Sequence, residues 1–490
     1  MTLFSEYLRE LMQTRQMTVS ELARLSGIER TQLSRTLTGK RMLPYHALDE
    51  LIFHLKLPPG EEKVLRLHYD AQFEKEGIRR SREMISSLFG NLACLDFSAP
   101  AFEETRLLMG LDEYVGECSV FHGETNVQFL LRMILSVEMA RPDARLEITV
   151  PPSDTFLTGE LIHRYLDNKT MMDISQIICF DAASTGTDIN LHNLDCLCRI
   201  LPICLLSRQH YHPCYYYDNN LSTRYTDPFP YFLITHSCVL CLSEEGTSAM
   251  LLRSSDAVSY YRRHFRALQE KCYNLIHYTT NPLEILSSYQ RCTEEDGFYI
   301  VMDQPCFGRF YVDDFVSNHL RKGIPDYKEI LQAATERFAL LQKVSRFYTF
   351  FTEAGIKRFM GDGTLDDFPV EIVEPFLPKE RSKLVKKLAA AIKSGDVTGR
   401  IMQEGTFPSY LAMCTSADQS IGFFTTRPFP LADGLCSVQV NESNICRAFH
   451  SWMMHLPVSR LVMTAQETAD VLESMDNDVQ NERRAYEKTI

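Results

Sequence analysis

The sequence lacks the segments that would direct it to or through a membrane. No apolar run approaches the ~20 residues that a membrane-spanning helix needs. The first ten residues, MTLFSEYLRE, carry acidic side chains and no basic region ahead of an apolar core, so we expect no secretory signal peptide. Fifteen cysteines without such a signal predict reduced thiols rather than a disulfide framework. The sequence therefore predicts a cytoplasmic protein with no membrane partner.

The sequence also lacks the short motifs of common catalytic and cofactor sites. GxxxxGK[ST], HExxH, GxSxG and GxGxxG are all absent. We therefore expect that the protein is not an enzyme and that it binds no cofactor.

The one local group of possible metal ligands is rich in cysteine. It contains a CxxC, Cys238 to Cys241, which by itself is compatible with half of a zinc site or with a redox pair. Both cysteines fall in a predicted strand, Phe229–Leu242, where residues i and i+3 point to opposite faces. We therefore predict thiols that pack as small apolar side chains, and no metal site. The group consists of Cys196, Cys198, Cys204, Cys214, Cys238 and Cys241, with His210 and His212 nearby.

Length and charge divide the chain unequally. At 490 residues it should hold two or three domains. The formal net charge is −13, but residues 1–70 carry ten basic and nine acidic residues, so the remainder carries −14. An acidic body is repelled by duplex DNA, whereas a small basic face can still bind it.

The stretch Met17–Arg41 has the pattern of two short helices joined by a tight turn. Leu22, Ala23 and Leu25 face inward from the first helix, and Gly27 ends that helix where a left-handed residue costs least. Leu33 and Leu37, four residues apart, face inward from the second helix.

The outer face of the second helix is polar and basic. From Arg30 to Arg41 there are four basic residues and no acid. Arg and Gln near the start of a helix can reach base edges in a major groove, while Thr, Ser and Lys suit phosphates. The candidate DNA-binding residues are Thr18, Arg30, Thr31, Gln32, Ser34, Arg35, Lys40 and Arg41.

Residues 3–70 resemble the XRE (Cro/repressor-like) helix-turn-helix family. The matching features are the E-L-A of Glu21–Ala23, the Gly27–Ile28 turn, the L-S of Leu33–Ser34, the Gly39–Arg41 exit, and Leu48, Leu51 and Leu55 on the following helix. The resemblance implies a five-helix domain that binds DNA. Two positions depart from the family pattern, because Val19 stands where Gln is frequent and Glu29 stands where Ser or Thr would cap the helix.

We predict four segments along the chain. Residues 1–70 form the helix-turn-helix domain, 71–99 a helical linker, 100–290 the first half of a regulatory region and 291–490 its second half. The linker is charged at first and then apolar, which favours a connecting helix that is interrupted near Gly77.

The region after residue 100 mixes short strands with helices. Leu146–Val150 and Gln176–Phe180 each follow a helical stretch, which is typical of an α/β or α+β fold. The predicted strand Phe229–Leu242 meets a turn at 243–246, and 247–253 returns as its hairpin partner. The predicted fold is thus a multidomain one, with an all-α domain followed by a large α+β (α/β) region.

Further helices are expected in this region. One starts at Ser255, and another at Asn281, where an N-cap, a proline and a capping-box Glu occur together. Ile324–Ala354 and Lys379–Lys393 also have a helical pattern.

The elements of the first half recur in the second, which indicates an internal duplication. Phe407–Ala412 echoes Phe229–Ile234, and a longer hairpin turn (Arg427–Gly434) and a helix around Phe449 follow it. A capping box then begins at Thr464. Chance matching of one strand–turn–helix pattern is the alternative.

Two aromatic patches remain open to two interpretations. Tyr211–Asp218 and the helix start at Tyr260–His264 are compatible with the lining of a ligand pocket. Packing of aromatic side chains and a solvated helix face explain them as well.

These features predict a one-component transcriptional regulator. The N-terminal domain binds double-stranded operator DNA, and the C-terminal region senses a small-molecule or peptide effector and forms a homodimer, since dimers that read half-sites ~34 Å apart are the usual solution. The alternatives are a peptide-pheromone receptor with a helical-repeat body, an enzyme fused to a helix-turn-helix module, and an antitoxin-like partner-binding protein. The predicted strands argue against the first, and the missing motifs argue against the second.

Overall fold

The structure, a computed structural model, divides the chain into two compact units. They are residues 1–80, called the N-terminal unit below, and residues 81–490, called the body. The residues that the structure describes are 3–41, 43–70, 76–95, 118–166, 171–182, 189–218, 227–293, 297–311, 315–366, 368, 370–416, 419–425 and 436–475. No described helix is long and apolar enough to cross a membrane.

The N-terminal unit contains five consecutive helices. They are α1 (Leu3–Thr14), α2 (Val19–Ser26), α3 (Arg30–Leu37), α4 (Tyr45–Leu55) and α5 (Pro59–Asp70). All five contribute apolar side chains to one core. Leu22, Ala23, Leu33 and Leu37 are buried in it as predicted, whereas Leu25, which was predicted to face inward, is exposed. Phe4 at the start of α1 contacts Tyr69 near the end of α5 with ring centroids 5.3 Å apart, so the first and last helices close the domain.

The body contains two β-sheets of the same topology. The first has the strand order β1-β7-β6-β5-β2-β3-β4-β8 and the second β9-β15-β14-β13-β10-β11-β12. Each sheet contains three neighbouring parallel strands, β2-β3-β4 in the first and β10-β11-β12 in the second. Three antiparallel strands continue the sheet from β2 or β10, and the first strand of each half, β1 or β9, pairs with the last of them. The duplication predicted from the sequence is therefore confirmed by strand order and direction.

The strands of the first sheet are β1 (Cys118–His122), β2 (Arg145–Ile148), β3 (Asp173–Asp181), β4 (Tyr211–Asp218), β5 (Tyr231–Ile234), β6 (Val239–Leu242), β7 (Ser248–Leu252) and β8 (Tyr273–Asn274). Those of the second are β9 (Ile276–Thr279), β10 (Gly297–Val301), β11 (Arg346–Thr352), β12 (Thr398–Met402), β13 (Leu411–Thr415), β14 (Ile421–Thr425) and β15 (Ser437–Val440). The change from one sheet to the other thus falls between β8 and β9, at Leu275, rather than at residue 290.

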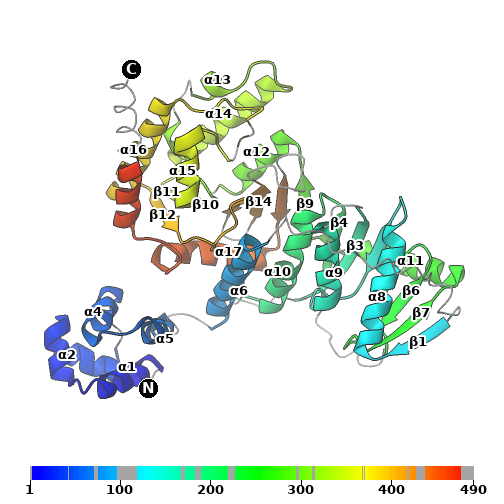
Figure 1. Ribbon diagram of the computed structural model, residues 1–490, viewed down its shortest axis with the longest axis horizontal. Helices are drawn as coiled ribbons and strands as arrows, with labels where there is room; N and C mark the ends of the chain where they lie inside the picture. The colour runs from blue at the N-terminus through cyan, green and yellow to red at the C-terminus, as the bar shows by residue number, and fades with distance from the viewer. Residues whose placement is uncertain are drawn as a thin grey trace, which may run out of the picture. The chain divides into compact units, whose positions relative to one another are not determined.

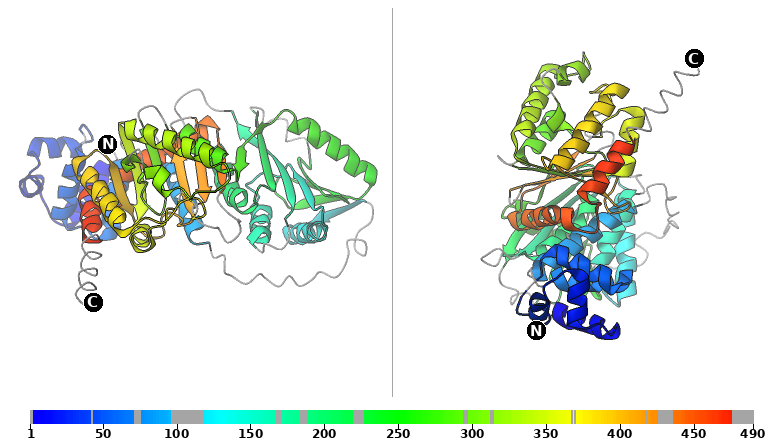
Figure 2. Two further views of the ribbon diagram at one scale, coloured as in Figure 1. Left: turned by 90° about the horizontal axis from the view of Figure 1, so that it is seen from above. Right: turned by 90° about the vertical axis from the view of Figure 1, so that its left-hand side faces the viewer.

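Helices cover both faces of each sheet (Figure 2). On the first sheet, α8 (Glu124–Met139), α9 (Thr155–Leu166) and α10 (Leu191–Leu206) pack on one face and α11 (Ser255–Gln269) on the other. On the second, α12 (Pro282–Arg291), α14 (Tyr327–Lys343), α15 (Glu353–Asp362) and α16 (Pro378–Ser394) pack on one face and α17 (Ser443–His455) on the other. The short helices are η2 (Gly308–Phe310), α13 (Phe315–His319) and η3 (Leu456–Val458), and residues 465–475 are also helical.

Two sequence predictions about these elements are wrong. Phe229–Leu242 is not one strand, because β5 and β6 are joined by a turn in which the N–H of Thr235 donates to the carbonyl of Cys238 (3.0 Å). Ile324–Ala354 is not one helix, because Arg346–Thr352, rich in aromatic residues and threonine, forms the interior strand β11. Helix α6 (Glu76–Ala93) begins one residue before Gly77, where the sequence predicts an interruption of the linker helix. The hairpin turn predicted at Arg427–Gly434, and residues 71–75 and 96–99 of the predicted linker, lie outside the described residues.

The capping predictions are confirmed at one helix and only partly at the other. The carboxylate of Glu467 accepts from the N–H of Thr464 (2.8 Å), and the Thr464 hydroxyl accepts from the N–H of Glu467 (3.2 Å), which is a complete capping box. At α12, Asn281 caps the helix and Pro282 begins it, but the carboxylate of Glu284 lies beside His277 (3.8 Å) instead of reaching back.

The two halves of the body share one apolar core. Residues 81–93 of α6 lie beside α17 (Figure 1), where Phe89 packs on Trp452 with ring centroids 5.1 Å apart. The indole N–H of Trp452 donates to the Ser86 hydroxyl at 2.8 Å. Across the halves, Tyr217 on β4 donates to Glu442 at 2.8 Å, and the other oxygen of this carboxylate caps α17. Neither half could leave the other without exposing this core to water.

We predict that limited proteolysis will separate the two units but not the two halves. Early cleavage is expected between residues 70 and 81, because the units divide there. The products should be one fragment of about 9 kDa and one stable fragment of about 47 kDa, identified by mass spectrometry. Early cleavage between residues 270 and 300 into two stable fragments would contradict a shared core.

A buried polar cluster fixes the end of β10 to α15. The guanidinium of Arg358 lies 2.6 Å from Asp303 and 2.5 Å from Asp366, and both carboxylates are almost fully buried. Thr352 caps α15 and also donates to the Asp303 carboxylate at 2.5 Å. The backbones approach so closely here that a Cβ added to Gly355 would lie 1.9 Å from the carbonyl oxygen of Asp303.

This close approach predicts opposite effects for two glycines of the same helix. Gly355→Ala should lower stability by about 3 kcal/mol or more, because the backbone of β10 must move. Gly361→Ala is the matched control, since an added Cβ meets nothing there, and it should raise stability by up to about 1 kcal/mol. Thermal unfolding of the full chain measures both changes, and equal midpoints for the two variants would contradict the close approach.

Candidate DNA-binding surface

The geometry of α2 and α3 follows from local signals. Thr18 precedes α2 with an extended backbone, and its hydroxyl accepts from the N–H of Glu21 at 3.2 Å. Gly27 ends α2 with φ of 68°, a left-handed conformation that favours glycine. Helix α3 then starts after Glu29, whose side chain makes no capping hydrogen bond. Because Glu29 stands where Ser or Thr would cap the helix, the first backbone N–H groups of α3 have no side-chain cap and are available to an anion.

Helix α3 is fixed to the domain from its inner side. Leu33 and Leu37 are buried in the core, and the carbonyl of Thr36 accepts from the hydroxyl of Ser5 at 2.7 Å. Arg9 donates to the carbonyl of Leu37 at 2.7 Å. Because these hydrogen bonds from α1 hold the last turn of α3 on its inner side, the outer face of α3 keeps one orientation on the domain.

The predicted DNA-binding residues lie on this outer face or at its ends. Arg30, Thr31, Ser34 and Arg35 are exposed on α3, and Gln32 is half-buried. Lys40 and Arg41 are exposed just after α3, and Thr18 is exposed at the start of α2. The hydroxyls of two of these residues are already engaged, since Thr18 caps α2 and Thr31 donates to Glu29.

Other arginines of the N-terminal unit are engaged in holding the fold. The guanidinium of Arg9 is bonded to the end of α3, and that of Arg66 lies 2.6 Å from Asp49 and 3.0 Å from Glu62. Two carboxylates thus partly neutralise the charge of Arg66, while a backbone carbonyl holds the guanidinium of Arg9.

The four basic residues on the outer face have no such partner. Within the described part of the chain, Arg30, Arg35, Lys40 and Arg41 form no ion pair and no side-chain hydrogen bond. Each can therefore bind a phosphate or a base edge without first breaking an internal contact.

The comparisons with known proteins agree with this surface. Residues 3–65 match the family model of a helix-turn-helix domain. No curated protein matches the chain. Residues 3–65 are thus an N-terminal helix-turn-helix domain, which is followed by a large mixed α/β body.

Two solved structures are similar to the chain at a low level. One is TrmBL2, an archaeal chromatin protein described as showing a novel mode of DNA binding, with 12% identity and a TM-score of 0.24 over 53% of this chain and 88% of that chain. The other is the phosphatidylserine synthase of Haemophilus influenzae Rd KW20, with 9% identity and a TM-score of 0.24 over 84% of this chain and 100% of that chain. These likenesses are too low to assign a function to the body.

The cysteines of the body are dispersed through its cores. All fifteen cysteines of the chain are free. Cys238 lies in the β5–β6 turn and packs in the core beneath α8 to α10, while Cys241 lies on β6 and packs beneath α11. The two thiols of the CxxC thus point to opposite faces of the sheet. Among the described residues no group of three His, Cys, Asp or Glu side chains could hold a metal ion.

We predict that the purified protein contains no stoichiometric zinc and that a chelator leaves its melting temperature unchanged. Burial raises the pKa of the Cys196 and Cys214 thiols to about 12, so at neutral pH they are protonated and slow to alkylate. The exposed Cys94 and Cys118 should therefore react first with iodoacetamide, as measured by peptide mass spectrometry. One zinc per chain, or preferential labelling of Cys196, would contradict this assignment.

The two aromatic patches are largely structural. Tyr211 is buried on β4 and donates to the side chain of Gln176 at 2.5 Å, and Tyr215 stacks on Phe180. On α11, the guanidinium of Arg262 lies 3.2 Å from the buried carboxylate of Glu147. These side chains are engaged in packing and ion pairing.

Proposed function

We propose that the protein is a sequence-specific transcriptional regulator that binds operator DNA through α3. The observation that carries the proposal is the set of four unpaired cations on α3 and directly after it in a helix-turn-helix domain, while Arg9 and Arg66 of the domain are engaged internally. Arg30, Gln32 and Arg35 read base edges, and Lys40 and Arg41 bind the DNA backbone.

The body supplies regulation in this proposal and carries out no reaction. It contributes −15 of formal charge, so it is repelled by DNA and leaves binding to the small N-terminal domain. A single domain of this size buries too little surface for tight specific binding. We therefore propose that the protein acts as a homodimer on two half-sites ~34 Å apart, and that an effector bound to the body alters their spacing.

The test is to select an operator from a randomised duplex library and to measure binding of full-length variants by fluorescence anisotropy. Gln32→Ala and Arg35→Ala should each weaken operator binding by about 1–3 kcal/mol and change binding to random DNA little. Lys40→Ala should weaken both duplexes alike and reduce the salt dependence.

Gln13→Ala is the matched control, because Gln13 is exposed on α1 and lies outside the proposed surface. It should leave both affinities unchanged. Equal losses on operator and random DNA for Gln32→Ala and Arg35→Ala would overturn their assignment as base readers, and a light-scattering mass of one chain on the operator would overturn the dimer.

A further inference from the structure

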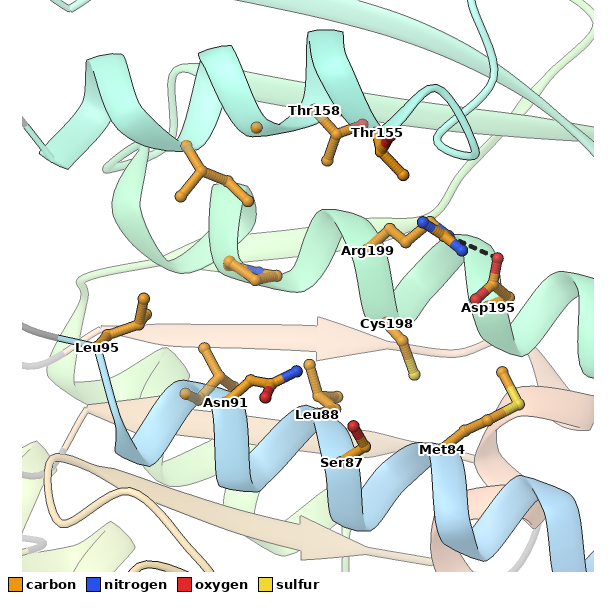
Figure 3. A pocket seen from close by; sticks show the side chains of 14 residues that line it. Met84, Ser87, Leu88, Asn91, Leu95, Thr155, Thr158, Asp195, Cys198 and Arg199 are labelled. Carbon is orange, nitrogen blue, oxygen red and sulfur yellow. Dashed lines mark hydrogen bonds and ion pairs between the residues drawn. The ribbon is translucent and has the colours of Figure 1, made fainter.

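Three helices of the body enclose a groove of about 530 Å³ (Figure 3). One wall is formed by residues 84–95 at the end of α6, and the opposite walls by α9 and α10. The volume falls within the range of about 300–1,000 Å³ that is usual for small-molecule sites.

Two residues that disfavour helix formation line this groove from the walls facing α6. Gly159 lies in the middle of α9, where glycine weakens a helix, and a Cβ added there would meet no atom within 4 Å. Packing therefore does not require glycine at this position, and its effect is to leave the groove open. Pro202 lies inside α10 and also lines the groove. Such departures from local preference are characteristic of functional sites.

The lining defines the chemistry of a ligand. Met84, Leu88 and Ile162 present apolar surface from two of the three helices. Among the described residues of the lining, the charged side chains are Asp195 and Arg199, which form an ion pair with each other at 2.6 Å. Because these charges compensate each other, the site favours an uncharged ligand over an anion or a cation.

Polar groups at the groove add hydrogen-bonding capacity. Pro202 has no N–H to donate to the carbonyl of Cys198, one turn earlier, and Cys198 also lines the groove. In Figure 3 the side chains of Asn91 and Thr158 approach the same space from α6 and α9. A ligand with one or two hydrogen-bonding groups on an apolar body fits this lining.

Helix α6 forms one wall of the groove, contacts α17 and extends into the N-terminal unit. On the side of α17, Phe89 packs on Trp452, and Ser86 accepts from the indole N–H. The N-terminal end of α6 lies in the N-terminal unit, so α6 belongs to both units. A ligand in contact with Met84 and Leu88 therefore touches the helix that links the body to the N-terminal unit.

We propose that this groove binds an uncharged, mainly apolar small molecule and that α6 responds to its binding. The binding site stands on the groove alone, whereas its role as the effector site of a regulator rests on the function proposed above.

The experiment is a titration of the full-length protein, without DNA, with the uncharged apolar dye Nile red. The wild type should bind one dye per chain in a saturable manner, with a blue-shifted emission. Gly159→Leu should weaken binding by about tenfold or more, because the leucine fills the groove without a clash. Gly361→Leu is the matched control, since it places the same side chain on an exposed helical glycine away from the groove, and it should bind as the wild type does.

Trp452 is the only tryptophan of the chain, so its emission reports the surroundings of α6. Its emission should change when the dye binds to the wild type and to Gly361→Leu. In Gly159→Leu its emission should stay constant over the same dye concentrations. Absence of saturable binding, or equal affinity in all three proteins, would overturn the site. Binding that depends on Gly159 but leaves Trp452 unchanged would overturn the response of α6. Since no DNA is present, these outcomes are independent of whether α3 binds an operator.

Discussion

Burial of α6 against α17 is the interaction on which the arrangement of the body depends. Phe89 is fully buried and lies with its ring centroid 4.7 Å from that of Phe407 and 5.1 Å from that of Trp452. The indole N–H, which would be costly to bury alone, is satisfied by Ser86 on α6. The helix thus becomes part of the core that the two halves share. It also forms one wall of the groove and contains the N-terminal boundary of the body.

The sequence predicted those features whose signals lie within a few residues of one another. The Gly27 turn and the Thr464–Glu467 capping box need only contacts within about one helical turn. The failures occurred where tertiary structure decides. Arg346–Thr352 is flanked by helical sequence, but it is a strand because β10 and β12 pair with it on both sides. The turn at Thr235 lies at three polar residues, Thr235–Ser237, between two apolar runs, and it was missed because it contains no glycine or proline to mark it.

The candidate sites differ in the same way. The DNA-binding surface comes from one stretch of about 25 residues, so its residues could be named from the sequence. The groove joins α6, α9 and α10, which are separated by tens of residues in the chain, and no periodicity brings them together. The available signals were Gly159 and Pro202, each inside a helix. These residues become informative only once both are seen to line the same space.

The chain divides its charge between the same two parts that have different roles in the proposed function. The N-terminal 70 residues are nearly neutral, and four of their unpaired cations lie on α3 or directly after it, while the body carries the excess acid. In the proposed regulator, repulsion between the acidic body and DNA opposes binding, so the contacts made by α3 must outweigh it. Helix α6 spans the division between the two units. The ligand proposed for the groove would therefore contact the helix that links the two units, and it shifts their equilibrium only by the difference in its affinity for the two states.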